Sequence, residues 1–97
     1  MKQDNNFYIV RGDRSGVFFG NIANRKGQEV ELTNVRRLWY WDGAASISQL
    51  AQEGVKRPSG CKFTMTSPSI TILDAIEINP CTEAAVEVIK GVPEWKR

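Results

Sequence analysis

The side chains that could perform chemistry in this sequence are two cysteines and scattered carboxylates, and histidine is absent. With only Cys61 and Cys81 available, one chain cannot supply four Cys or His ligands to a zinc ion. Serine and cysteine nucleophiles of the common kinds depend on a nearby base, usually histidine, that takes their proton. We therefore expect a protein that is not an enzyme and that holds no metal ion and no cofactor.

Five carboxylates could act in pairs, but none of them lies in a recognisable catalytic motif. They are Asp13, Asp42, Asp74, Glu77 and Glu83. We interpret each as a turn former, a helix cap or a solvated charge.

Glycines at positions 12, 16, 20 and 27 fall around predicted strand turns rather than at a junction between a strand and a helix. This placement argues against a phosphate loop of the Walker or dinucleotide type. Backbone amides in such turns can still cradle an anion, and Arg11 and Arg14 flank the first turn. We interpret the segment as a hairpin turn and keep both arginines as candidate ligand-binding residues.

The most unusual segment is RRLWYW, residues 36–41, whose residue types favour a strand. Alternation in a regular strand sends its side chains to two faces: Arg37, Trp39 and Trp41 to one, and Arg36, Leu38 and Tyr40 to the other. The arginines and aromatic residues are candidate ligand-binding positions, and Lys56 and Arg57 could extend a positive rim.

Two interpretations of this strand remain open. In the first, both tryptophans fill the core and Tyr40 lies beneath the helix that follows. In the second, one face presents aromatic rings or a guanidinium beside a ring, a combination that stacks bases and clamps phosphates. The same combination supplies hot spots at protein interfaces.

The first forty residues predict a four-stranded meander. Gly27 can take the positive φ that a tight hairpin requires, and Thr33-Asn34 provides another short connection. Four segments are rich in β-branched and aromatic residues or alternate polar with apolar: 7–11, 17–23, 28–32 and 35–41.

Two short helices are predicted beyond the meander. Ser46 and Gln49 match a capping box at the start of the first helix, and Gly54 suits its end. Thr82 can cap the second helix, which Gly91 stops.

Between these helices, residues 61–66 and 69–79 predict a hairpin around Ser67-Pro68. The apolar pattern of the longer strand is interrupted, so we expect a bulge or bend near Asp74-Ala75. The tail, residues 92–97, has Trp95 as its anchor.

Length and composition predict one domain over residues 1–97, because a chain of 97 residues is too short to bury two cores. The fold class is α+β: a mostly antiparallel twisted sheet of five or six strands with two short helices, which could close as a small barrel. A formal net charge of +2 does not by itself require a nucleic-acid partner. With no apolar span and no leader-like start, we expect a cytoplasmic protein with reduced cysteines. The aromatic content favours a homo-oligomer.

At this point the chain resembles a known family. The run GVFFG, the segment RRLWYWDGAASISQLAQEGV, the CKF triplet and the later IEINPCTEAA are similar to small phage and prophage proteins grouped as a domain of unknown function. The resemblance covers nearly the whole chain, and its LWYW-x-GAAS-x-SQLA run is specific. It implies a viral origin and a host bacterial cytoplasm, and it brings no catalytic residues to carry over.

This context favours a counter-defence binding protein that sequesters a nucleotide-like ligand or blocks a host defence protein. A small β domain that binds nucleic acid is the first alternative, and it would use the same arginines and aromatic residues. A structural or assembly protein with an oligomer interface is the second.

Overall fold

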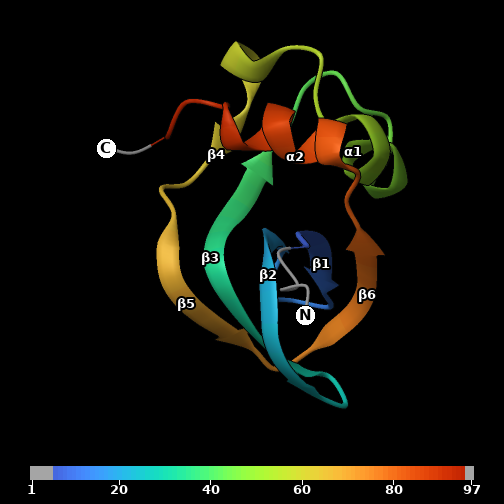
Figure 1. The fold of residues 1–97 in the computed structure, drawn as a ribbon, viewed down its shortest axis with the longest axis vertical. Helices are drawn as coiled ribbons and strands as arrows, with labels where there is room; N and C mark the ends of the chain where they lie inside the picture. The colour runs from blue at the N-terminus through green and yellow to red at the C-terminus, as the bar shows by residue number, and fades with distance from the viewer. Residues whose placement is uncertain (1–5, 96–97) are drawn as a thin grey trace, which may run out of the picture.

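Residues 6–95 are described in a computed structural model of the chain, and they form a strongly curved antiparallel sheet with two helices (Figure 1). The strands are β1 (Tyr8–Gly12), β2 (Val17–Lys26), β3 (Glu29–Tyr40), β4 (Lys62–Phe63), β5 (Ser67–Ile72) and β6 (Ala75–Pro80). The helices are α1 (Ile47–Glu53) and α2 (Glu83–Lys90), and a single 3-10 turn, η1, spans Pro58–Gly60. The predicted α+β class, with five or six strands and two short helices, is confirmed with six strands.

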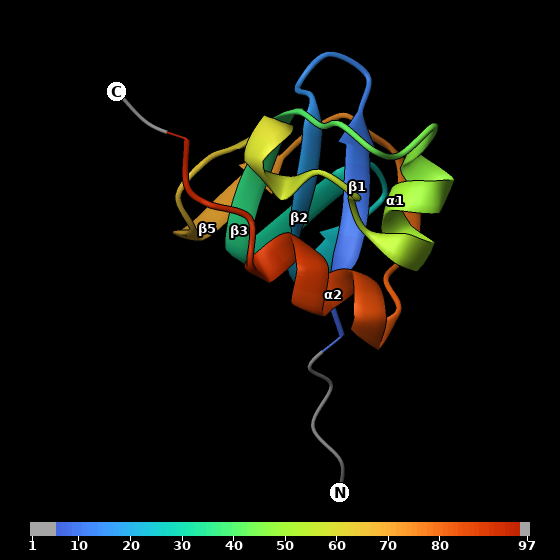
Figure 2. The same ribbon diagram turned by 90° about the horizontal axis from the view of Figure 1, so that it is seen from above.

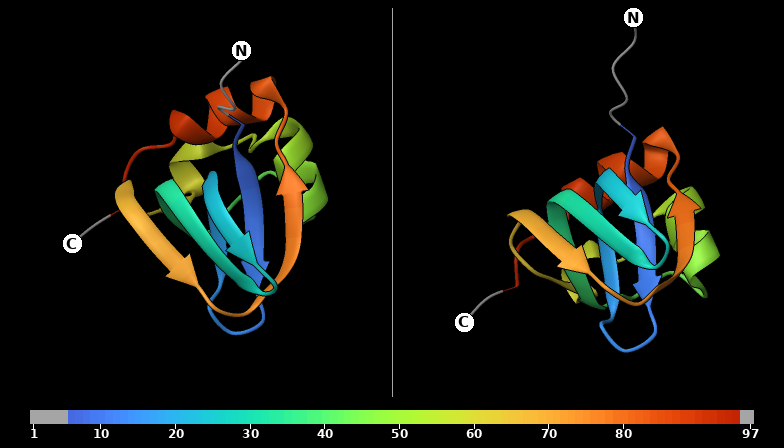
Figure 3. Two further views of the ribbon diagram at one scale, coloured as in Figure 1. Left: turned by 60° about the horizontal axis from the view of Figure 1, so that its bottom comes forward. Right: turned by 90° about the horizontal axis from the view of Figure 1, so that it is seen from below.

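The sheet has the strand order β4-β3-β2-β1-β6. The edge of β3 that faces away from β2 pairs with two short strands: β5 along its first part and β4 along its last part. β6 runs antiparallel to β1, with Ile78 opposite Val10. β5 and β6 are consecutive in the chain, yet they lie at opposite edges of the curved sheet (Figure 3). Within residues 6–95 these two strands do not pair, so the sheet does not close into a barrel.

The predicted four-stranded meander is wrong because its last two strands are one. β3 continues through Thr33 and Asn34, the residues interpreted as a turn. Asn34 has a φ of 49°, and the register gains a residue on β3, with Thr33 opposite Asn21 and Arg36 opposite Phe19. Asparagine tolerates this left-handed conformation, so Asn34 forms a β-bulge and the strand continues past it.

The predicted hairpin around Ser67-Pro68 is also wrong. Both residues belong to β5. A proline is tolerated there because β5 lies at the edge of the sheet. The predicted bend near Asp74-Ala75 is confirmed, since the chain turns at Leu73 and Asp74 between β5 and β6. The expected long strand is therefore two strands on opposite edges.

Both faces of the central strands are buried, which explains the unbroken apolar runs in β1 and β2. On one face, Ile9 and Phe19 pack with residues of α1 and α2 in a helix-side cluster. On the other face, Val10 and Phe18 belong to a second cluster built from β-strand residues. Consecutive residues thus enter different halves of the core, and alternation between apolar and polar residues disappears.

The two helices begin and end where their capping residues predict. Ser46 Oγ accepts a hydrogen bond from the Gln49 amide at 3.1 Å, while Gln49 Oε1 accepts from the Ala45 amide at 2.8 Å. Gly54 ends α1 with a φ of 76°, and Thr82 caps α2. The helices lie side by side (Figure 2), joined by a 2.7 Å hydrogen bond from the Thr82 hydroxyl to α1. No helix in residues 6–95 is long and apolar enough to cross a membrane.

Candidate functional site

Two β-bulges in β3 decide which way its side chains point. After the bulge at Asn34, Val35 packs in the strand cluster beside Val10, and Arg36 points to the helix side. Arg37 returns to the strand side, where its guanidinium carbon lies 4.7 Å from the centre of the Phe18 ring. The side chains of Arg36 and Arg37 therefore point to opposite faces, as predicted.

A second bulge exposes two consecutive aromatic residues. Leu38 lies opposite Phe63, whereas Tyr40 lies opposite Lys62, so Trp39 is the extra residue. Phe63 is buried with Leu38 on the helix side, so its neighbour Lys62 points to the other face. Tyr40 is paired with Lys62 and therefore lies on this other face, together with Trp39. Trp39 is 62% exposed and Tyr40 is 55% exposed. The predicted separation of these two rings onto opposite faces is wrong, and so is the burial of Trp39 in the core.

Trp41 differs from its two neighbours because it is half-buried against the helix-side cluster. Next to it, Asp42 pairs with Arg57, whose Nη1 lies 2.8 Å from the carboxylate. The Arg57 amide also donates to the Asp42 carbonyl at 3.4 Å. These bonds bring the loop that carries Lys56 and Arg57 beside the end of β3, as a positive rim would require.

Arg36 is buried, so it does not present the exposed guanidinium that the second interpretation of this strand allows. The residue is only 4% exposed. Its Nε donates to the Thr64 carbonyl at 2.8 Å, and Nη1 donates to the Ile89 carbonyl of α2 at 2.8 Å. Nη2 lies 3.3 Å from the Phe63 carbonyl oxygen and 3.5 Å from that of Pro93. Arg36 therefore joins β4, the last turn of α2 and the tail.

The electrostatic setting of Arg36 fits this structural role. Burial lowers the pKa of its guanidinium, and the negative charge of Glu94 acts in the opposite direction. Its hydrogen-bond acceptors are main-chain carbonyls, including one at the negative end of the α2 dipole, where a cation is favoured.

Lys62 and Trp95 complete a surface around the two exposed rings. The Trp95 amide donates to the Phe63 carbonyl at 2.8 Å, so the tail is held beside β4 by its main chain, while the Trp95 indole is exposed. The Lys62 ammonium lies 5.5 Å from the centre of the Trp95 ring. We call Trp39, Tyr40, Lys62 and Trp95 the aromatic surface. The last two residues of the predicted tail, 96 and 97, lie outside the described residues.

The segment beside Arg11 and Arg14 is a hairpin turn between β1 and β2, as interpreted, and its amides bind a carboxylate of the chain itself. Asp74 accepts hydrogen bonds from the Arg14 and Ser15 amides at 2.7 and 3.1 Å and from the Ser15 hydroxyl at 2.6 Å. These bonds lower the pKa of Asp74, and the bond from the Ser15 hydroxyl has the largest effect. The Arg11 guanidinium lies 3.8 Å from Glu77. The amides of the β1–β2 turn thus hold Asp74, which lies in the connection between β5 and β6.

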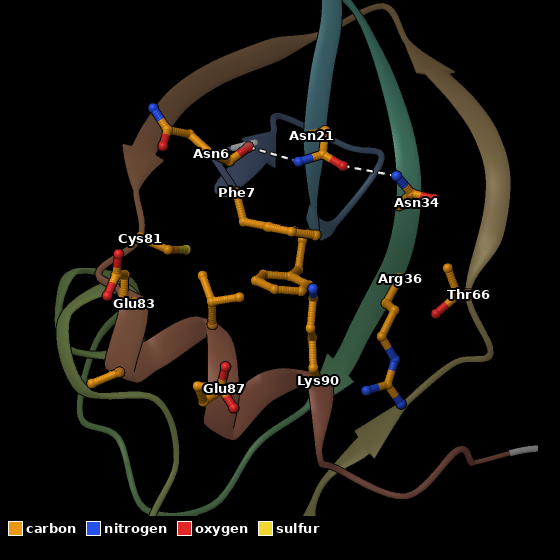
Figure 4. A pocket seen from close by; sticks show the side chains of 13 residues that line it. Asn6, Phe7, Asn21, Asn34, Arg36, Thr66, Cys81, Glu83, Glu87 and Lys90 are labelled. Carbon is orange, nitrogen blue, oxygen red and sulfur yellow. Dashed lines mark hydrogen bonds between the residues drawn. The ribbon is translucent and has the colours of Figure 1, made fainter. Parts of the chain in front are cut away.

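A groove of about 1380 Å³ lies between α2 and the sheet (Figure 4). Its sheet side carries a chain of amides, in which Asn34 Nδ2 donates to Asn21 Oδ1 at 2.8 Å and Asn21 Nδ2 donates to the Asn6 carbonyl at 2.7 Å. On the helix side, the Lys90 ammonium lies 4.4 Å from the centre of the Phe7 ring. Amides of this kind could hydrogen-bond a polar ligand.

The charges that line this groove are balanced. Arg36 and Lys90 contribute two positive charges, and Glu83 and Glu87 contribute two negative charges. Burial raises the pKa of the Cys81 thiol to about 11, so this group is neutral at physiological pH. A ligand with several phosphate charges therefore gains little electrostatic attraction from the groove.

Sequence reasoning missed Lys62, Trp95 as a partner of Lys62, and the groove amides. The strand predicted at residues 61–66 does contain β4, and the triplet Cys61-Lys62-Phe63 alternates apolar, charged and apolar side chains. Its pairing with the end of β3 was not recognisable, because the bulge at Trp39 sets the register.

The chain is a small, open antiparallel sheet with two helices and an aromatic surface at the end of its longest strand. Residues 6–89 match the family described as "Domain of unknown function (DUF6948)", and the chain belongs to this family. The resemblance to a domain of unknown function is thereby confirmed. No curated protein and no solved structure matches the chain.

Proposed function

We propose that this protein is a non-catalytic binding domain that takes nucleotide-type ligands, meaning a base with its phosphate, on the aromatic surface. The observation that carries the proposal is the exposure of Trp39 and Tyr40 on the face that also holds Lys62. Large consecutive aromatic side chains are normally buried in a domain of this size, and exposed ones mark interaction surfaces.

The chemistry of the surface suits a base and its phosphate. Within residues 6–95, Trp39 and Tyr40 have no ring contact and no side-chain hydrogen bond, so their π faces are free to stack a base. Lys62 supplies a cation beside them, and Lys56 lies on the neighbouring loop, where the charge of Arg57 is balanced by Asp42. The groove under α2 offers no comparable excess of positive charge.

The proposed biological role is counter-defence in a phage-infected bacterium. It rests on the resemblance of the LWYW-x-GAAS-x-SQLA run to phage and prophage proteins and on the absence of a recognisable catalytic motif in the sequence. Phage origin and a cytoplasmic location belong to this proposal. Sequestering a signalling nucleotide or a nucleic-acid strand requires affinity rather than turnover, which a surface of rings and cations can provide.

The test is a direct measurement of the binding of base-containing probes. The quenching of tryptophan fluorescence reports the binding. One arm uses linear mononucleotides and cyclic dinucleotides, and the other uses a labelled oligothymidylate of twelve nucleotides. We expect saturable binding in at least one arm, with affinity that falls as salt rises. Trp39→Ala should weaken binding by about 1–3 kcal/mol, roughly five- to 150-fold.

Three further variants show whether the effect belongs to the surface. Trp39→Phe keeps an aromatic face and should retain most of the affinity, while Lys62→Ala should reduce the salt dependence. Leu73→Ala is the matched control, because Leu73 is 71% exposed but lies at the turn between β5 and β6. The proposal is wrong if no probe binds at low salt, or if Trp39→Ala binds as tightly as the parent.

A host protein is the second candidate ligand, and the exposure of Met65 near β4 favours it. Methionine and tryptophan are enriched at protein interfaces, and Met65 is an exposed apolar residue in the segment that directly follows β4. A photo-crosslinker at position 65 should then capture one host protein during infection, and Trp39→Ala should abolish the capture. Capture that survives Trp39→Ala would exclude this surface as the interface.

A further inference from the structure

A second cluster of positive charge lies outside the aromatic surface, in a cleft between the β1–β2 turn and β5. The cleft has a volume of about 440 Å³ and is lined by Arg14, Ser15, Phe18, Arg37 and residues 70–74. Among these residues, Arg14 and Arg37 carry positive charges, and Asp74 carries the single negative charge. The cleft therefore has an excess of positive charge, which the groove under α2 lacks.

The Arg37 guanidinium is fixed in this cleft without a carboxylate partner. Its Nη1 donates to the Ser15 carbonyl at 3.0 Å, and its guanidinium carbon lies 4.7 Å from the centre of the Phe18 ring. Within the described part of the chain, its Nε and Nη2 donate no hydrogen bond, and no carboxylate forms an ion pair with it. The Asp74 carboxylate instead accepts hydrogen bonds from Arg14 and Ser15. Arg37 thus presents positioned donors in the fork that binds two oxygens of a phosphate.

The register of the sheet puts Arg37 and Lys62 on opposite flanks of the exposed rings. Arg37 lies opposite Phe18 of β2, whereas Tyr40 lies opposite Lys62 of β4, on the other side of β3. Arg37 and Trp39 are two residues apart on the same face of β3, which is about 7 Å along a strand. The rings therefore lie between two cationic positions, one on the β2 side and one on the β4 side.

We propose that the cleft at Arg37 is a second phosphate subsite, so that the ligand of the aromatic surface carries a phosphate on both sides of the stacked base. This inference rests on the proposed function, because it starts from a base stacked on Trp39. A mononucleotide has its phosphate at one end and reaches only one of the two cations. A nucleotide joined to others by phosphodiesters, in a single strand or in a cyclic dinucleotide, reaches Lys62 and Arg37 together.

The experiment measures the affinity of the full chain for a labelled oligothymidylate of twelve nucleotides at salt concentrations between about 50 and 200 mM. Each phosphate contact to a single strand contributes about 0.7 to the slope of log affinity against log salt. Arg37→Gln removes one charge, so the slope should become shallower by about 0.7 and the affinity at low salt should fall about tenfold. Trp39→Ala should weaken binding and leave the slope unchanged, because an indole stacks on a base and binds no phosphate.

Two further variants separate a phosphate contact from a structural role of Arg37. Arg37→Lys keeps the charge but not the planar fork, so it should restore the slope and only part of the affinity. Arg25→Gln is the matched control, since it removes the same charge from an exposed arginine of the β2–β3 hairpin and should change neither quantity. Circular dichroism shows that each variant is folded. The same series with a cyclic dinucleotide distinguishes the two sources of the phosphodiester, because the change of slope assigns the subsite to the probe that shows it.

The outcomes distinguish this subsite from the proposed function. Binding that weakens in Trp39→Ala but keeps the parent slope in Arg37→Gln, with both probes, overturns the subsite and leaves the proposed function standing. An equal change of slope in Arg25→Gln shows general attraction to the charge of the chain and also overturns the subsite. Absence of binding by every nucleotide probe overturns both.

Discussion

Replacing Arg36 by alanine is the sharpest test of how this fold is held together. The guanidinium makes two hydrogen bonds of 2.8 Å and two longer ones, all to main-chain carbonyl oxygens of β4, α2 and the segments beside them. Alanine removes these four bonds and leaves a void next to the Phe63 ring, whose centre lies 5.5 Å from the guanidinium carbon. The Phe63 and Ile89 carbonyls keep their main-chain donors, the amides of Trp95 and Val92. The penalty falls on stability, because the guanidinium bonds main-chain groups and not the side chains of the aromatic surface.

The size of the effect follows from the number of acceptors. A hydrogen bond from a charged group contributes about 1.5–3 kcal/mol, and water entering from the groove favours the lower end. Two well-formed bonds and two weaker ones then give a loss of about 3–4 kcal/mol, a large part of the roughly 5–15 kcal/mol typical of a domain. At about 4–8 °C per kcal/mol for a chain of this size, the melting temperature should fall by at least about 12 °C.

Thermal and urea unfolding, followed by circular dichroism, measure this loss. Arg36→Lys should fall between parent and alanine variant, because an ammonium keeps the charge but cannot reproduce the planar fork. Arg25→Ala is the matched control at an exposed arginine of the β2–β3 hairpin, and it should change stability by less than about 0.5 kcal/mol. An Arg36→Ala variant that melts within about 3 °C of the parent would refute the structural role of the guanidinium.

The remaining predictions concern three other parts of the fold. The hydrogen bonds from Ser15 lower the pKa of Asp74 in the folded state, so their contribution is present above the ordinary pKa of 3.8 and is lost as the pH falls through the lowered value. Urea titrations from neutral pH into acid should therefore show a smaller acid-induced loss of stability in Asp74→Asn than in the parent, and equal losses would contradict the linkage. Both cysteines are free thiols, and burial raises the pKa of Cys81 to about 11, so Cys81 should resist alkylation in the folded protein near neutral pH. Mass spectrometry of the denatured, unreduced chain should count two alkylated groups, at Cys61 and Cys81, and a count of zero would show that they pair. Gly54→Ala should destabilise the contact between the helices, because its φ of 76° disfavours alanine and the new Cβ would lie 2.7 Å from a side chain of α2. A melting temperature unchanged from the parent would contradict this reason for the glycine.

The fold class, the helix caps and the bend near Asp74 could be predicted because each depends on local chemistry. Ser46, Thr82 and Gly54 act within one helical turn, and their residue types are sufficient to identify them. Asn34 shows where local reasoning fails. Asparagine suits a turn and a bulge equally well, and only pairing with both neighbouring strands keeps β3 continuous.

The candidate site depended on a fact that no local pattern contains, namely the register of β3. One extra residue at Trp39 reverses the face of Tyr40, and the earlier bulge at Asn34 decides that Arg36 rather than Arg37 is buried. A shift by one residue exchanges the two faces of a strand. The segment was correctly identified as unusual, but the roles of its individual residues required the long-range pairing.

The pairing of β1 with β6 has a consequence for how the chain folds. Val10 and Ile78 are opposite each other although more than two thirds of the chain separates them, whereas β2 and β3 are joined by a tight hairpin. Closing a loop of about 70 residues rather than a few costs about 3 kcal/mol more in chain entropy. The three N-terminal strands should therefore assemble first, and β6 should dock late, with overall folding in the millisecond-to-second range typical of sheets with distant contacts. Until β6 arrives, β1 is itself an unpaired edge. A nascent chain that stalls before Pro80 would expose that edge, and such intermediates are the ones that aggregate.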